Sequence, residues 1–290
     1  MSTRIAYICV IFIWSTTPLA IKWSSEGVGI FFGVSARMVL GLLVAYLILY
    51  VMKSRLPWHR PALKTYFSSG LGIYSAMSCV YWASQYIPSG WISVVFGLSP
   101  IITGIMAVIM LREDALLPHK LLGMLLGFAG LLTIFGTGMH AGNNFIFGIA
   151  AVLAGTTFHS LSAVIIKQIN AQLSGIASTA GGLTFAVPMF LVTFIIFEGN
   201  LPVEINNKSL YAIIYLGVIA SAIGFALYYY ILSNMEVSRV SLITLVSPVC
   251  ALTLGNMLNG EDVSFLVLTG AGLIISGLLF YEYGDKMIKR

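Results

Sequence analysis

Few side chains in this sequence combine reactive chemistry with apolar surroundings. His159 lies midway along one apolar stretch and is the deep residue whose side chain titrates near neutral pH. Arg37 lies inside another such stretch, where a cation is costly and usually faces protein or water. We interpret Arg37 as a contact for a solute anion or as a structural contact to helix ends. His159 is either a cavity residue or a hydrogen-bonded core histidine.

Aromatic and hydroxyl side chains make up most of the remaining candidates. Tyr74 and Tyr81 fall on one helical face, and Tyr228 and Tyr229 follow each other in a later stretch. Aromatic walls with a few hydroxyls suit a neutral or zwitterionic organic solute, although aromatic residues also gather at membrane interfaces. We therefore predict a solute cavity lined by Trp14, Thr17, Tyr74, Tyr81, Ser99, His159, Tyr228, Tyr229 and Ser247.

One pattern occurs twice, at an offset of 148 residues. Ser99 and Pro100 correspond to Ser247 and Pro248, each pair inside an apolar stretch. A proline within a helix frees the carbonyl one turn earlier and bends the helix, and a neighbouring hydroxyl could satisfy that carbonyl or face the solute. The repeat predicts two helix bends, at Pro100 and Pro248, with simple packing kinks as the alternative.

Composition places most of this chain in lipid. The 290 residues are 59% hydrophobic and 9% charged, whereas soluble domains contain about 25% charged residues. A helix that crosses a bilayer needs about 20 mostly apolar residues. On this basis the sequence predicts ten transmembrane helices, at about 4–22, 29–52, 64–86, 90–111, 119–137, 146–167, 174–197, 209–232, 239–258 and 264–283.

Lysine and arginine predict the orientation. With the N-terminus inside, twelve of these residues fall on the inner side, and only Lys22 and Lys208 lie at outer ends. Both termini are then cytoplasmic. Because five is an odd number, the second set of five helices enters from the opposite face. We predict an all-α integral membrane protein, a single transport domain over 1–290, with inverted repeats 1–140 and 141–290 around a central cavity.

Carboxylates fall at predicted helix ends rather than in the middle of apolar stretches. Glu113, Asp114, Glu261 and Asp262 precede the fifth and tenth predicted helices, where they are expected to cap exposed backbone N–H groups.

Signatures of enzymes are missing from the sequence. It contains no HExxH, no GxSxG and no phosphate-binding loop, and its three cysteines have no metal-ligand spacing. We therefore predict no enzymatic activity, no metal, no cofactor and no nucleic-acid partner; the partners are a small-molecule solute and the lipid bilayer. The oligomeric state is left open.

The ordered set of features resembles the EamA-type family of the drug/metabolite transporter superfamily. It comprises Trp14, Arg37, the two Ser-Pro pairs, Glu113 with Glu261, and the glycine-rich fifth and tenth helices. The resemblance implies export of a metabolite or amino acid across the bacterial inner membrane. We predict a secondary transporter that works by alternating access. The alternatives are an importer or exchanger of a scarce metabolite, a membrane-embedded enzyme, and a passive channel.

Overall fold

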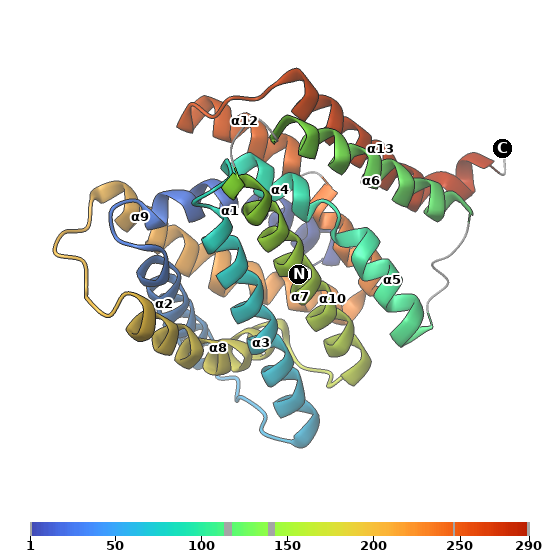
Figure 1. Cartoon of the computed structure of the whole chain (residues 1–290). Helices are drawn as coiled ribbons and strands as arrows, with labels where there is room; N and C mark the ends of the chain where they lie inside the picture. The colour runs from blue at the N-terminus through green and yellow to red at the C-terminus, as the bar shows by residue number, and fades with distance from the viewer. Residues whose placement is uncertain (1, 113–117, 139–142, 246, 289–290) are drawn as a thin grey trace.

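The computed structural model describes residues 2–112, 118–138, 143–245 and 247–288 (Figure 1). Within these residues the structure is helical, without strands, so the predicted all-α class is confirmed. The elements are α1 (Thr3–Ser25), α2 (Ile30–Val51), α3 (Arg60–Ala83), α4 (Ser89–Phe96), α5 (Ser99–Leu111), α6 (Pro118–Gly138), α7 (Asn143–Ile169), α8 (Gly175–Phe197), α9 (Asn207–Tyr215), the π-helix η1 (Leu216–Gly224), α10 (Phe225–Asn234), α11 (Val237–Val240), the 3₁₀ helix η2 (Ser241–Leu245), α12 (Ser247–Asn259) and α13 (Phe265–Ile288).

Six helical segments in the described residues are long and apolar enough to cross a membrane. They are Thr3–Ser25, Ile30–Val51, Ser89–Leu111, Asn144–Ile169, Gly175–Phe197 and Asn207–Asn234. The apolar length of these segments supports a multi-pass membrane protein. The count of ten crossings and the cytoplasmic termini remain predictions.

Polar side chains fix where several helices begin. Asn206 accepts from the backbone N–H of Ser209 at 2.8 Å at the start of α9, and Ser174 does the same for α8. The start of α2 is capped by a residue far away in the sequence. Glu198 accepts from the backbone N–H groups of Phe31 and Phe32 at 3.0 and 2.8 Å. A carboxylate at a helix N-terminus also meets the positive end of the helix dipole.

Each of the two Ser-Pro pairs begins a helix, at the points where the sequence predicts bends. α4 stops at Phe96, and a turn through Gly97 and Leu98 leads into α5, whose second residue is Pro100. Pro248 is likewise the second residue of α12, after the 3₁₀ helix η2. Proline has no N–H to donate and is tolerated in the first helical turn, where that donor would have no intrahelical partner. Each Ser-Pro pair therefore lies in the first turn of a helix, and a bend of the helix axis at these points remains a prediction.

Helices α6 and α13 run side by side along one edge of the molecule (Figure 1). Glycines allow this approach: a Cβ added to Gly277 would lie 2.5 Å from the Gly123 carbonyl oxygen, and one added to Gly130 would lie 2.5 Å from the Gly270 carbonyl oxygen. Small residues permit such close backbone packing in lipid. The other helices enclose the buried core, in which α3 packs against α7 and α8, and α2 packs against α8 and η1.

Candidate functional site

A cavity lies among helices from both halves of the chain. About 660 Å³ between its walls is free of protein atoms, including the part that opens to solvent. Organic ligands usually occupy concave sites of this kind, with apolar walls and a few polar groups. The walls are formed by Trp14, Thr17, Pro18, Ile21, Arg37, Met77, Val80, Ile92, Ser93, Phe96, His159, Ala220, Phe225, Thr244 and Ser247.

Three aromatic rings from distant segments meet at one side of this cavity. Trp14 in α1 lies 5.0 Å from Tyr228 in α10 and 5.6 Å from His159 in α7, measured between ring centroids. The rings of His159 and Tyr228 are 5.1 Å apart, and Phe96 approaches His159 at 6.2 Å. Offset and edge-to-face contacts at these separations are favourable. Four of the helices are therefore joined by an aromatic cluster, of which Trp14, Phe96 and His159 line the main cavity and Tyr228 lines two smaller ones.

Arg37 reaches the cavity from α2 although it is buried, with only 1% of its surface exposed. Its Nε and Nη2 atoms both donate to the Ser221 hydroxyl at 3.1 Å, and the guanidinium lies 5.9 Å from the ring centroid of Tyr81. Its Nη1 atom has no hydrogen-bond partner among the described residues. Ser221 belongs to the π-helix η1, a form of helix that occurs frequently at functional sites.

Some predicted cavity residues lie beside the cavity rather than in its wall. Tyr81 is 1% exposed, and its hydroxyl pairs with Ser24 at 3.0 Å. The Tyr74 hydroxyl pairs with Thr193 of α8 at 2.7 Å. Both tyrosines share a helical face as expected, but that face packs against the neighbouring helices α1 and α8 instead of lining the cavity.

Other predicted residues line smaller cavities next to the main one. Ser99 shares one of these with Trp14, His159 and Tyr228, while Tyr229 shares another with His159 and Tyr228. Trp14, Thr17, His159, Ser247 and Arg37 lie in the wall of the main cavity itself.

Several wall residues escaped prediction from the sequence. Phe96, Ser93 and Thr244 line the cavity, and Thr103 donates to Ser160 at 2.9 Å close to Ser99. The same offset of 148 residues does give one signal, because Phe96 corresponds to Thr244 and both line the wall. Neither residue type is unusual inside an apolar stretch, so only the repeat could have singled them out.

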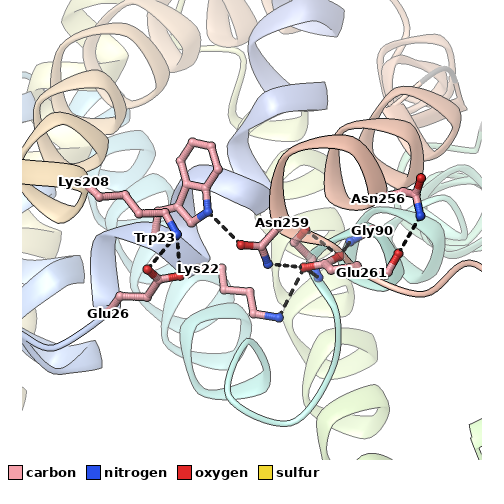
Figure 2. Close-up of polar contacts among 9 residues, drawn as sticks. Lys22, Trp23, Glu26, Gly90, Lys208, Asn256, Asn259 and Glu261 are labelled. Atoms are coloured by element: carbon pink, nitrogen blue, oxygen red, sulfur yellow. Dashed lines mark hydrogen bonds and ion pairs between the residues drawn. The ribbon is translucent and has the colours of Figure 1, made fainter.

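Glu261 caps a helix other than the one expected for it (Figure 2). The carboxylate accepts from the backbone N–H groups of Ser89 and Gly90, at 3.0 and 3.2 Å, and from the Ser89 hydroxyl at 2.9 Å. These groups form the start of α4, whereas the sequence predicted a cap for the helix that follows Glu261. Glu113 and Asp114 lie outside the described residues.

A lysine and an amide complete the surroundings of this carboxylate. Lys22 at the end of α1 and Asn259 at the end of α12 donate to it at 3.2 and 3.0 Å, and Asn259 also accepts from Trp23. Burial alone would raise the pKa of Glu261, but hydrogen bonds from Ser89 and the charge of Lys22 outweigh burial and hold that pKa below its ordinary value. The carboxylate therefore stays charged at neutral pH and joins the ends of α1, α4 and α12.

Among the described residues, no group of three or more His, Cys, Asp or Glu side chains is placed to hold a metal ion. The cavity wall instead offers aromatic faces, hydroxyls and one guanidinium. Those groups can bind and orient an organic solute. Within the described residues that line the cavity, the only groups suited to proton transfer or nucleophilic attack are one histidine and several alcohols.

Known proteins resemble the chain over its whole length. YoaV, an uncharacterized transporter of Bacillus subtilis, is 25% identical over 288 residues, which cover 98% of this chain and 97% of YoaV. A protein of Streptantibioticus cattleyicolor, named a probable terminal-alkyne amino-acid exporter, is 22% identical, with 94% and 91% of the two chains covered. One crystal structure, 17% identical, shares the fold with a TM-score of 0.76 and covers 100% of this chain and 99% of that chain.

The helices, the cavity and these matches point to one family. The sequence profile of the EamA-like transporter family matches residues 1–136 and 146–282, which together span most of the chain. This chain therefore belongs to the EamA-like transporter family.

Proposed function

We propose that this protein is a secondary transporter that moves a small organic metabolite, an amino acid or a similar compound, across the bacterial inner membrane by alternating access. Export is the direction we favour, because one relative is named a probable terminal-alkyne amino-acid exporter. The observation that carries the proposal is the cavity itself, whose wall joins Trp14, Arg37, His159 and Ser247 from four separate helices. A wall built from several helices can change shape when those helices move relative to one another.

The inverted repeat supplies the motion in this proposal. Repeats 1–140 and 141–290 have opposite orientations, ten helices cross the bilayer, and both termini face the cytoplasm. Rocking of the helices around the two Ser-Pro junctions then exposes the cavity to each side in turn. Membrane proteins that contain such repeats bind their solutes at the interface between the repeats, near the middle of the bilayer.

A topology experiment tests the orientation. Single cysteines at Ser2 and Val203, in a variant that lacks Cys9, Cys79 and Cys250, are labelled with a membrane-impermeant maleimide in intact cells. Val203 is fully exposed in a loop, so we expect the cysteine of Val203→Cys to be labelled from outside. The cysteine of Ser2→Cys should react only after the cells are opened. Labelling of Ser2 in intact cells would contradict the proposed orientation.

Transport itself is measured with the full chain in proteoliposomes. Vesicles loaded with a panel of unlabelled amino acids and related metabolites are diluted into trace labelled solute, with and without a pH gradient. We expect counterflow of at least one solute, inhibited by excess of the same solute outside. If no solute shows counterflow and one of them is converted into a product, the protein is a membrane-embedded enzyme and the transporter proposal fails. Vesicles without internal solute distinguish net transport from exchange, because an exchanger requires solute on both sides and takes up no labelled solute into empty vesicles.

A further inference from the structure

We propose that Arg37 binds the carboxylate of the transported solute, and that the solute class is therefore small monocarboxylates with an apolar body. This inference rests on the proposed transport function and narrows its substrate. It concerns the guanidinium alone and assigns no role to the other wall residues.

The first step is the hydrogen bonding of the guanidinium. A guanidinium has five N–H donors in a planar fork that matches a carboxylate. The Ser221 hydroxyl accepts from Nε and Nη2, whereas Nη1 is buried without a partner among the described residues. Buried polar atoms are normally paired, and each exception requires an explanation such as a missing ligand. Because Nη1 is also closed off from solvent in this arrangement, the wall around it must open locally before an acceptor supplied by the solute satisfies this nitrogen.

The second step is the balance of charge. Among the described residues that line the cavity, Arg37 is the single permanently charged one, and none is Asp or Glu. An uncompensated cation is costly in such a setting, and an opposite charge brought in by a ligand repays part of this cost. The cavity therefore favours an anion over a neutral solute, and disfavours a solute whose only charge is positive.

The third step concerns the positioning of Arg37. Ser221 and the ring of Tyr81 hold the side chain from two directions, and Tyr81 is itself fixed by its hydrogen bond with Ser24. A guanidinium that is fixed before the ligand arrives loses little conformational entropy on binding. Residues held in this way are typical of recognition sites.

The fourth step identifies the kind of anion. One guanidinium with one unpaired nitrogen matches one carboxylate better than a phosphate dianion, which generally meets several cations or backbone N–H groups. The rest of the wall is mainly apolar, with Trp14, Phe96 and Phe225 among its largest side chains. A carboxylate attached to an aliphatic or aromatic body fits both parts of the wall.

The experiment measures ligand-dependent thermal stability of the purified full-length chain in detergent. The probes are two matched sets at millimolar concentration: leucine, isocaproate and leucinamide, then phenylalanine, hydrocinnamate and phenylalaninamide. A ligand that binds only the folded protein raises the Tm. We expect at least one acid of these sets to raise the Tm and its amide, which lacks the carboxylate, to leave the Tm unchanged. If no acid raises the Tm, or the amides act as well as the acids, the proposal is overturned.

Variants of Arg37 give the second readout. Arg37→Gln should weaken binding of the active acid at least about 10-fold, and Arg37→Lys should weaken it less, because lysine keeps the charge but loses the fork. Without ligand, Arg37→Gln should have a Tm equal to or above that of the wild type, since it removes an incompletely paired buried charge. Arg60→Gln, at the exposed start of α3, is the control for loss of one positive charge.

The outcomes separate this proposal from the transporter proposal. A variant of Arg37 that still responds to the acid, or that loses several degrees of Tm without ligand, would show that Arg37 has a structural role. If amines or neutral solutes undergo counterflow while acids do not, the transport function stands and the carboxylate assignment fails. If no solute is transported but the acid still protects the wild type and fails to protect Arg37→Gln, the site stands and the transport function fails.

Discussion

Replacing Glu261 by glutamine removes one negative charge from the place where three helix ends meet (Figure 2). One carboxylate oxygen accepts from Lys22, from the Ser89 backbone and from Asn259, and the other accepts from the Ser89 hydroxyl and from the backbone of Gly90. Glutamine has nearly the same shape but only one acceptor oxygen. Its amide nitrogen must therefore take the place of one of the two carboxylate oxygens.

The cost follows from this geometry. If the amide nitrogen replaces the oxygen that faces Gly90, the Ser89 hydroxyl can turn and accept, but the buried N–H of Gly90 loses its partner. An unsatisfied buried donor costs about 1–3 kcal/mol. The ion pair with Lys22 contributes less, about 1 kcal/mol, because 31% of the lysine side chain is exposed to solvent. We expect Glu261→Gln to lower the free energy of unfolding by about 2–4 kcal/mol.

Heating of the detergent-solubilised chain, followed by size-exclusion chromatography of the remaining folded protein, measures this loss. At neutral pH the apparent Tm should fall by about 5–10 °C. The native pKa of Glu261 lies below its ordinary value of about 4.3. The stabilisation is therefore fully present above that ordinary pKa and is lost as pH falls through the lower native pKa. The difference between wild type and variant should be constant from pH 7 to about pH 5 and should shrink below about pH 4.

The neighbouring carboxylate provides the matched control. Asp262→Asn removes the same charge one residue later, from a side chain that is exposed. We expect its Tm to stay within about 2 °C of the wild type, as is usual for surface substitutions. Equal Tm values for Glu261→Gln and the wild type, or equal losses for the two variants, would refute the reasoning from hydrogen-bond geometry.

Three further substitutions test the packing and the cavity. Gly277→Val should lower the Tm, because the valine side chain would meet the backbone of α6 and reduce the free energy of unfolding by about 1–3 kcal/mol. Gly272→Val, on the open face of the same helix, should leave the Tm unchanged. Equal Tm values for the two variants would contradict the close packing of α6 and α13. Trp14→Ala should reduce counterflow at least about 10-fold by removing two ring contacts, while Phe12→Ala, exposed on the other side of α1, should leave it intact. If His159 takes part in proton coupling, His159→Ala will abolish the pH dependence of transport, and an unchanged profile would exclude that role.

Much of the fold was predictable because lipid imposes simple rules on sequence. Long apolar stretches must be helical in a bilayer, so the helical class followed from hydropathy. The fifth and tenth predicted helices stood out for their glycines, and Gly123 and Gly277 now lie against each other, although the packing of these two helices was not predicted. The breaks at Pro100 and Pro248 were visible as prolines. Whether a proline bends a helix or begins a new one depends on the backbone before it, which the sequence pattern does not determine.

The roles of individual polar residues were harder to predict, because they depend on which helices become neighbours. Helical spacing placed Tyr74 and Tyr81 on one face, but could not say whether that face meets the cavity or another helix. Glu261 was expected to cap the nearest helix in sequence and instead caps α4, which precedes it by about 170 residues. Contacts over such separations are tertiary, and local pattern carries little information about them.

The cavity and the contact at Glu261 are built on the same two helices, which links solute binding to the ends of those helices. In α1, Ile21 lines the cavity, and the next residue, Lys22, donates to Glu261. In α4, Gly90 donates to the same carboxylate, and Ile92 two residues later lines the cavity. Packed helices shift between discrete arrangements rather than deform continuously. Separation of α1 from α4 around a solute therefore requires Glu261 to release one of the two helices. A solute can drive that change only by the amount that it binds the separated arrangement more tightly.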